Sequence, residues 1–242
     1  MRIIKSIVSL LESSEFAIAN EACALCGFPV SVRLCKMDIG VRCPICGASA
    51  ISQSLVEALR CNISSLIDCD AYELSSVGVL VSFLKRRTRS LTVSEFFDDV
   101  PVGAFSSGGV RCEDVQSLTF ADKSFDLCTS TEVFEHVTSD IAAFGELLRV
   151  LRPGGTLVFT VPLSDSRNTI ERTALHDGTR YLTMAAEYHA DRLRGPHVFC
   201  YRNYGRDILD RLRQVGFASA TFYRPTRRLF GFARDVVIAR RA

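Results

Sequence analysis

The pattern of apolar and polar positions changes near residue 61 and from there alternates between two periods. Apolar runs of strand length occur at residues 71–74, 91–95, 109–114, 125–130, 156–161, 217–223 and 235–239. Stretches with the spacing of an amphipathic helix occur at residues 51–60, 79–84, 139–151 and 204–215. Alternating strands and helices of these lengths predict an α/β fold with a doubly wound, mostly parallel sheet of seven strands. The last two strands predict an antiparallel hairpin at its edge.

The helix predicted at residues 139–151 has the clearest pattern of the four. Ser139 or Asp140 would cap its start, and Pro153-Gly154-Gly155 would end it. The stripe expected to face the core consists of Ile141, Phe144, Leu147, Leu148 and Leu151.

The first 60 residues follow a different pattern. Residues 1–20 combine apolar positions with acidic ones and lack a small-residue cleavage site, which predicts an amphipathic helix and not a signal peptide. Short strands are expected at residues 30–34 and 39–41. We therefore expect two parts, residues 1–60 and residues 61–242, with the helix at 51–60 as the link between them.

Four cysteines in the first part have the spacing of a metal site. They form two Cys-x-x-Cys-Gly motifs, at Cys23 and Cys26 and at Cys43 and Cys46. A two-residue gap lets both thiolates of a tight turn reach one tetrahedral ion at ~2.3 Å, and the glycine suits the turn that follows. The spacing predicts a structural Zn²⁺ ion in a small ribbon, with free or disulfide-bonded cysteines as the alternative.

The other six cysteines have no partner spacing. We interpret them as small apolar residues of the core and the strands: Cys35, Cys61, Cys69, Cys112, Cys128 and Cys200.

Composition narrows the classes of protein that fit. The chain has 242 residues, of which 48% are hydrophobic and 23% charged, values typical of a globular protein. No apolar run is long enough to cross a bilayer, so no membrane association is predicted. The net charge of +2 argues against nucleic acid as a partner. Ten cysteines without an export signal indicate reduced thiols and a cytoplasmic protein.

Acidic residues stand at or beside the ends of the first three predicted strands of the second part. These residues are Glu73, Glu95 and Asp114. In an open α/β sheet, ligands bind at the carboxyl ends of the strands. Glu95 follows Glu73 by 22 residues, close to the spacing at which an acid holds the two hydroxyls of a ribose. The pattern favours a nucleoside-type ligand over coincidence.

Four stretches resemble the core of class I S-adenosylmethionine-dependent methyltransferases. They are Asp114–Phe120, Ser124–Leu127, Glu132–Val137 and Arg149–Gly155, in the order and spacing of that family's third, fourth and fifth strand motifs. The resemblance centres on residues 70–161, is loose at both ends, and extends over about the last three quarters of the chain. It implies a Rossmann-like fold, S-adenosylmethionine as the cofactor and methyl transfer as the reaction.

The resemblance also implies roles for individual residues. Glu73 matches the acid that ends the first strand, near the methionyl and ribose parts of the cofactor. Glu95 matches the acid that holds the ribose, with Phe96 packed on the adenine. Asp114 matches the acid that binds the adenine amino group, with Val115 beside the ring.

The fourth strand would lead to the place where methyl donor and acceptor meet. Thr131, in the implied cofactor site, and Glu132 follow that strand, and His136 lies one helical turn further on. His136, Glu132 and His189 are our candidates for a catalytic base. The alternative for His136 is a packing or capping role in its helix.

The glycine-rich loop departs from the family pattern. Ser75, Ser76 and Val77 stand between Glu73 and Gly78, where the family has glycines that permit close backbone approach to the ligand. The Ser75 hydroxyl could bond the methionyl carboxylate, and Gly78 supplies the remaining glycine. We favour retained cofactor binding because the second and third acids remain.

The expected acceptor site lies in residues 162–204, a long connection rich in histidine and tyrosine. This composition suits a small molecule or a glycan-type acceptor, methylated on oxygen or nitrogen. Two alternatives stay open: an RNA methyltransferase, and a non-catalytic binding module with a degenerate cofactor pocket. The sequence leaves the oligomeric state undetermined.

Overall fold

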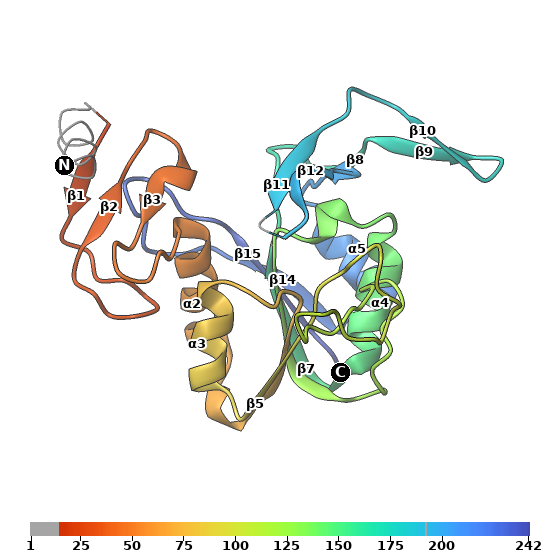
Figure 1. Ribbon diagram of the computed structural model, residues 1–242, viewed down its shortest axis with the longest axis horizontal. Helices are drawn as coiled ribbons and strands as arrows, with labels where there is room; N and C mark the ends of the chain where they lie inside the picture. Colours follow the sequence, from red (N-terminus) through yellow and green to blue (C-terminus); the bar gives the residue numbers. More distant parts are fainter. Residues whose placement is uncertain (1–14, 192) are drawn as a thin grey trace.

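A central sheet of six strands organises the molecule, which we describe from a computed structural model for residues 15–191 and 193–242 (Figure 1). Its strand order is β14-β15-β7-β6-β4-β5. The strands are β4 (Asp70–Glu73), β5 (Ser90–Val93), β6 (Phe125–Thr131), β7 (Leu151–Thr160), β14 (Ser219–Tyr223) and β15 (Val236–Arg240). The first four run parallel, and β15 runs antiparallel to both of its neighbours. The predicted doubly wound sheet with an antiparallel edge hairpin is confirmed.

The prediction of seven strands is wrong for the described residues. The run at 109–114 forms one parallel bridge, between Glu95 and Cys112, and no longer ladder. The Cys112 N–H donates to the Ala104 carbonyl (2.8 Å), and the Cys112 carbonyl accepts from the Gly103 N–H (2.7 Å). The bridge to Glu95 uses the Arg111 carbonyl and the Glu113 N–H, so residues 103 and 104 bond the opposite edge of this segment. The segment is thus bonded on both edges but pairs with the sheet at this one bridge.

Four α-helices cover the two faces of the sheet. Two, α2 (Ala50–Asn62) and α3 (Val79–Arg87), lie on one face, and α4 (Asp140–Val150) and α5 (Ile208–Val215) lie on the other (Figure 1). Serine caps begin two of them: Ser49 accepts from the Ser52 N–H and Ser139 from the Ala142 N–H, each at 3.2 Å. All four helices occur where the sequence predicts them.

The core-facing side of α4 differs in part from the predicted stripe. Phe144 and Leu147 are fully buried, whereas Ile141 is 40% exposed. The buried side passes instead through Ala143 and Val150. The stripe differs at its start because the buried position of the first turn is Asp140, whose carboxylate accepts from the Tyr204 hydroxyl (3.1 Å) and from Arg211 Nε (2.8 Å).

The sheet separates two hydrophobic cores. The larger core lies under α4 and α5 and includes Phe134, Phe144 and Phe159, whose rings pack edge-on or tilted with centroids 4.8–5.8 Å apart. The second core lies under α2 and α3 and extends into the cysteine-rich region. The N-terminal part is therefore packed against the sheet through a shared core.

The N-terminal ribbon has three short strands in the order β1-β2-β3. They are β1 (Ala17–Ala19), β2 (Ser31–Arg33) and β3 (Val41–Arg42), with the 3-10 turn η1 (Asp38–Gly40) before β3. The predicted hairpin is confirmed by the pairing of β2 with β3. The helix predicted at residues 1–20 is wrong at 17–19, which pair with β2, and its first 14 residues lie outside the described part.

A loop between β14 and β15 holds the ribbon from the other side. Arg227 forms an ion pair with Glu21 of the ribbon (2.9 Å), and Leu229 packs with Val41 and Ala50 in a small apolar cluster. Helix α2 itself contacts β7 and β15. Residues 50–60, which we expected to link two parts, thus also cover the sheet.

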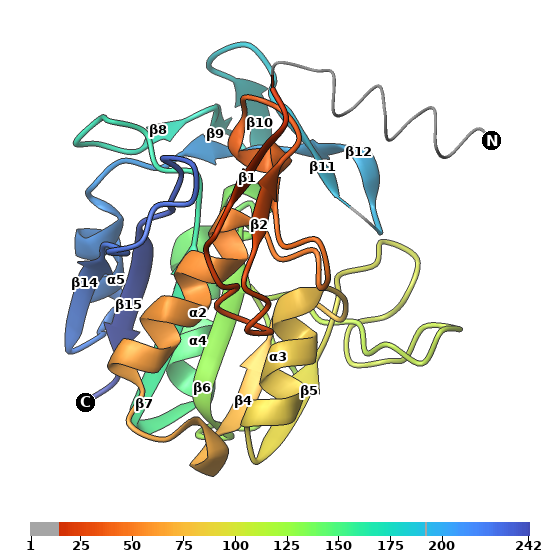
Figure 2. The same cartoon turned by 90° about the vertical axis from the view of Figure 1, so that its left-hand side faces the viewer.

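The long connection after β7 folds into small strands that the sequence did not indicate. They are β8 (Ile170–Glu171), β9 (Thr173–His176), β10 (Thr179–Leu182), β11 (Tyr188–Asp191), β12 (Gly195–Phe199) and β13 (Arg202–Asn203). Figure 2 shows β9–β12 above the carboxyl edge of the sheet. Two short turns, η2 (Leu66–Asp68) and η3 (Phe134–His136), complete the elements. Within the described residues, every helix is too short or too polar to cross a bilayer.

We expect Phe144→Ala to destabilise the fold by about 3–5 kcal/mol, because it removes a fully buried ring that packs on Phe134 and Phe159. Ile141→Ala, in the same helix but 40% exposed, should cost roughly 1 kcal/mol or less. Denaturant unfolding followed by circular dichroism measures both changes. Equal losses would contradict the assignment of the buried face of α4.

Candidate active site and cysteine cluster

The loop after β4 lies at the carboxyl edge of the sheet and leads into α3. Gly78 occupies the N-cap position of α3 with φ 113°, in the region that favours glycine. A Cβ atom added to Gly78 would meet no other atom within 4 Å. The loop therefore keeps an open approach at Gly78, although serines replace the other expected glycines.

Glu73 ends β4 and is buried beneath this loop. Its carboxyl accepts a hydrogen bond from the Thr129 hydroxyl of the neighbouring strand β6. Burial is the main cause that raises the pKa of Glu73, to about 8, and the charge of Glu95 adds to the rise. Near neutral pH this carboxyl is mostly protonated, which lowers the cost of burying it.

Glu95 and the serine loop form one hydrogen-bonded unit. Glu95 Oε1 accepts from the Ser75 hydroxyl (2.9 Å), the Ser76 N–H (2.7 Å) and the Ser76 hydroxyl (3.1 Å). The structure thus brings together Glu95 and Ser75, two of the residues expected to bind cofactor. Phe96, the next residue, is partly exposed, and the Arg194 guanidinium lies 5.4 Å from its ring centroid.

The third acid lies beyond the short bridge that replaces the third strand. Asp114 Oδ1 accepts from the Gln116 N–H (2.9 Å) and from the Gln116 side-chain amide (3.1 Å). The adjacent Val115 is 8% exposed and belongs to the larger hydrophobic core. The Val115 side chain therefore packs in the core, whereas the Asp114 side chain lies in a polar turn.

The end of β6 carries a conformation that non-glycine residues rarely adopt. Glu132, directly after Thr131, has φ 53°, and its N–H donates to the Thr160 carbonyl (2.9 Å). Its Oε1 atom is buried and has no hydrogen-bond partner among the described residues. The Arg234 Nε atom lies 3.6 Å away. Such strain at a buried carboxyl is typical of functional sites.

Burial also shifts the titration of Glu132. It raises the pKa of this carboxyl to about 7, and the nearby charge of Glu135 adds to the rise, while Arg234 opposes it. A carboxyl with a pKa near neutrality is suited to accepting a proton at physiological pH.

The two candidate histidines lie next to each other beside Glu132. The rings of His136 and His189 are 5.1 Å apart between centroids, in an edge-on arrangement. His136 belongs to η3, and His189 belongs to β11 of the connection. The Glu135 carboxylate, 3.8 Å from His189 Nδ1, is the main cause that raises the pKa of His189. The three candidate bases are therefore brought into one cluster.

Three members of this cluster were missed by sequence reasoning. Glu135 stands within the quoted Glu132–Val137 motif but received no role, Cys200 was assigned to the core, and Arg234 lies far along the chain. Burial raises the pKa of the Cys200 thiol to about 12. The position of Glu135 between two candidate bases is the one signal that could have identified it.

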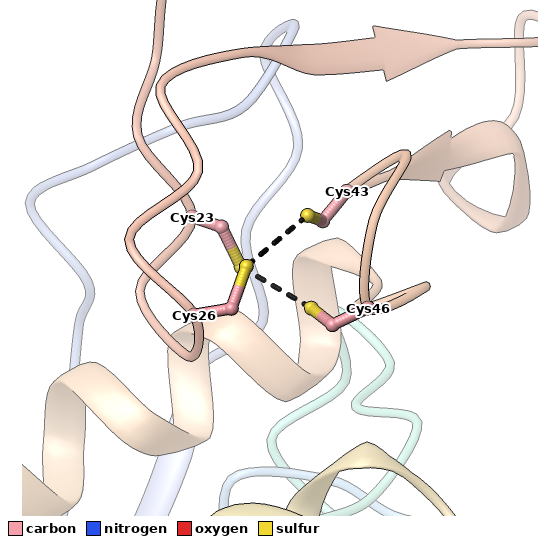
Figure 3. Close-up of side chains that lie close together, drawn as sticks. All are labelled: Cys23, Cys26, Cys43 and Cys46. Carbon is pink, nitrogen blue, oxygen red and sulfur yellow. Dashed lines mark hydrogen bonds between the residues drawn. The ribbon is translucent and has the colours of Figure 1, made fainter.

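The four cysteines of the ribbon converge as their spacing predicts (Figure 3). The sulfur atoms of Cys23 and Cys46 are 3.6 Å apart, those of Cys26 and Cys43 are 3.5 Å apart, and all four lie within 4.8 Å of one another. Each Cys-x-x-Cys turn closes on a glycine with φ near 77°, Gly27 at 78° and Gly47 at 76°. Among the described residues none of the cysteines forms a disulfide.

Comparison with known proteins identifies the central region. A family model described as a methyltransferase domain matches residues 78–159. An uncharacterized methyltransferase from Mycobacterium avium (strain 104) is 42% identical over 60 residues, which are 25% of this chain and 24% of that protein. A demethylmenaquinone methyltransferase from Mycobacterium sp. (strain KMS) is 35% identical over 85 residues, or 32% of this chain and 37% of that protein. The chain spans well under half the length of these relatives.

One solved structure covers more of the chain. The crystal structure of an S-adenosylmethionine-dependent methyltransferase from Mesorhizobium loti superposes with a TM-score of 0.50 and 19% identity, covering 78% of this chain and 98% of that one. Residues 78–159 thus match a methyltransferase domain, and the sheet has the Rossmann-like fold seen in class I S-adenosylmethionine-dependent methyltransferases.

We expect Glu73→Gln to flatten the pH dependence of stability. A carboxyl whose pKa is higher in the folded than in the unfolded state stabilises the fold when protonated. Its contribution therefore declines as the pH rises from about 4.5 to about 8. Between pH 5 and pH 8 the wild type should lose on the order of 2–4 kcal/mol more than the variant.

Urea unfolding at both pH values measures this difference. Asp210→Asn, at an exposed position of α5, serves as the control and should follow the wild type. Parallel curves for Glu73→Gln and the wild type would show that the pKa of Glu73 is not raised.

Proposed function

We propose that this chain transfers a methyl group from S-adenosylmethionine to an oxygen or nitrogen of a small-molecule or glycan-type acceptor. The observation that carries the proposal is the arrangement around Glu95. This carboxylate lies at the carboxyl edge of a methyltransferase-type sheet and accepts two hydroxyls and one N–H on a single oxygen. A carboxylate that accepts two neighbouring hydroxyls has the chemistry needed to hold a ribose diol.

The residues at this edge fit the proposed cofactor. Gly78 leaves open space beside the loop, and Glu95 Oε2 is not used by the loop serines. Phe96 is exposed enough to pack on an adenine ring, and Asp114 could bind its amino group. Ser75, Thr131 and Glu73 would surround the methionyl and ribose parts. When bound, the cofactor would supply a methyl group activated by a sulfonium centre.

We assign Glu132 as the base that removes a proton from the molecule to be methylated. Its pKa of about 7 and its unpartnered oxygen suit this task. Arg234, at 3.6 Å, would stabilise the ionised form. His136 and His189 lie within the same cluster and could orient the acceptor or relay the proton.

The connection after β7 would hold the acceptor. It places partly or fully exposed aromatic side chains near this edge, among them Tyr188, His197 and Tyr201. Tyr188 packs edge-on against His197 and Phe199, so these rings form a surface on the β11–β12 hairpin. Aromatic rings with polar tips suit the recognition of sugars or ring-bearing molecules.

A second candidate function is a non-catalytic module whose cofactor pocket is closed. The three bonds from the serine loop to Glu95 favour it, because they occupy Oε1, one of the two oxygens with which this carboxylate could hold a ribose diol. An RNA acceptor is the remaining alternative, and the net charge of +2 argues against it. Free thiols throughout the described residues agree with a cytoplasmic location.

We further propose that Cys23, Cys26, Cys43 and Cys46 bind one structural Zn²⁺ ion. Their convergence supports this, since tetrahedral S₄ sets are typical of zinc. Four thiolates leave no position for a substrate, so the ion would hold the two turns of the ribbon together. The second core and the α2 contacts would then depend on it.

We expect calorimetry to detect S-adenosylmethionine binding by the wild type and a loss of about 10–100-fold in affinity for Glu95→Ala, which removes a charged hydrogen-bond acceptor. Asp210→Asn, at an exposed position of α5, should bind like the wild type. Absence of heat for the wild type at millimolar ligand would favour the non-catalytic module. Unchanged affinity in Glu95→Ala would refute its assigned role.

We expect Cys26→Ser to lower the zinc content of the purified chain by about one ion per molecule. Cys26 is exposed, so the substitution disturbs packing less than at the buried Cys23. Cys35→Ser, between the two turns but outside the cluster, should retain the metal. Elemental analysis checks both variants, and equal zinc content in Cys26→Ser and the wild type would contradict the ribbon site.

A further inference from the structure

A second group of metal-binding side chains lies away from the ribbon, where the β11–β12 hairpin meets η3. His136, His189 and Cys200 each offer one ligand atom, and these atoms all lie within 4.8 Å of one another. Three separate segments supply them: η3, strand β11 and the residue after β12. Cys200 is 1% exposed, so the cluster is closed on that side.

A buried carboxylate provides an independent observation. Glu135 is 1% exposed, and neither of its oxygens has a hydrogen-bond partner among the described residues. Its Oε1 atom lies 3.6 Å from His136 Nε2 and 3.8 Å from His189 Nδ1. Burying a carboxylate without a partner is costly, and a positive charge beside Glu135, from a metal ion or from a protonated His189, would offset that cost.

In each ring, the nitrogen that points away from Glu135 already faces a hydrogen-bond acceptor. His136 Nδ1 lies 2.9 Å from the Phe199 carbonyl, which can only accept, so this nitrogen carries a hydrogen. His189 Nε2 lies 3.2 Å from Glu187 Oε1, which likewise accepts. When both rings are neutral, the inner nitrogens, His136 Nε2 and His189 Nδ1, carry no hydrogen, and their lone pairs face Glu135. Histidines that ligate metals are oriented in this way, by a carbonyl or carboxylate on the far nitrogen.

The spacing of the inner atoms fits coordination better than direct hydrogen bonds. Separations of 3.6 and 3.8 Å exceed the range of about 2.7–3.2 Å for a hydrogen bond. Two ligands held about 2.0–2.1 Å from one tetrahedral ion stand roughly 3.3–3.5 Å apart. Cys200 Sγ lies 3.8 Å from His136 Nδ1, so the thiol would also have to turn toward the inner nitrogens for all four groups to share one ion.

The geometry points to a second metal site, in which His136, His189, Cys200 and Glu135 bind one divalent ion of the zinc class. Two imidazoles, one thiolate and one carboxylate form a donor set that this class prefers. The ion would pin the β11–β12 hairpin to η3, next to Glu132. The site stands independently of methyl transfer, because it rests on these four side chains alone.

Metal analysis of the full chain tests the site. Protein reconstituted with Zn²⁺ and freed of excess metal should hold about two ions per chain. His189→Gln and Cys200→Ser should each hold about one, whereas Cys26→Ser should lose only the ribbon ion. His197→Gln, also on the β11–β12 hairpin but outside the cluster, is the matched control and should keep both.

X-ray absorption of the wild type gives a readout that needs no variant. Five thiolates shared by two ions give about 2.5 sulfur ligands per zinc, whereas the ribbon alone gives four. One ion per chain with only sulfur ligands would overturn the proposal and leave Glu135 paired with a protonated His189. Because neither measurement uses S-adenosylmethionine, failure of the second site leaves the proposed activity to its own test.

Discussion

A single buried hydrogen bond ties together the strands that carry the candidate site. The Thr129 hydroxyl of β6 donates to the Glu73 carboxyl of β4, and these two residues are also partners in the parallel ladder. The bond lies at the last residue of β4 and two residues before the end of β6, so it aligns the start of the serine loop with the segment of β6 that leads into Glu132. Glu95 then closes the loop from the adjacent strand end through three hydrogen bonds. Loss of this pairing would misplace both halves of the site at once, because each half starts from one of the two strands.

The cysteine ribbon is connected to the same edge through the C-terminal loop. Arg234 lies 3.6 Å from Glu132 and 3.5 Å from Asp38 of the ribbon, and its backbone N–H donates to the Ser54 hydroxyl of α2 (3.0 Å). One guanidinium thus contacts both the ribbon and the proposed base. The position of the Arg234 guanidinium would depend on an ordered ribbon. A structural metal in the ribbon could therefore affect the proposed base, Glu132, without contacting it.

The sequence predicted the framework well because local patterns determine it. Helix caps at Ser49 and Ser139, apolar runs and the two Cys-x-x-Cys turns act over a few residues, and the structure follows them. The seventh strand failed because residues 109–114 pair with the sheet only through the bridge to Glu95 and bond residues 103 and 104 on the other edge, which no local pattern reveals. The strands of the connection were not predicted, because β9 and β10 are almost wholly exposed and lack an alternation of buried and exposed residues. Cys200 and Arg234 were missed because only tertiary packing brings them to Glu132 and His136.

The edge also gathers three glutamates, of which Glu73 and Glu135 are buried and Glu132 is 21% exposed in its side chain, and a purely structural sheet would avoid such a group. Their neighbours differ: Glu73 has a hydroxyl donor, Glu132 a guanidinium, and Glu135 two imidazole rings. Burial raises the pKa of Glu73 to about 8 and that of Glu132 to about 7, so the first is largely neutral at pH 7 while the second is poised to exchange a proton. Protonated Glu73 thus permits the buried pairing of β4 with β6 without a full charge at the strand end. The pKa of Glu132 is set separately, by burial and by the opposing charges of Glu135 and Arg234, which leaves this carboxyl available for acid–base chemistry at the end of β6.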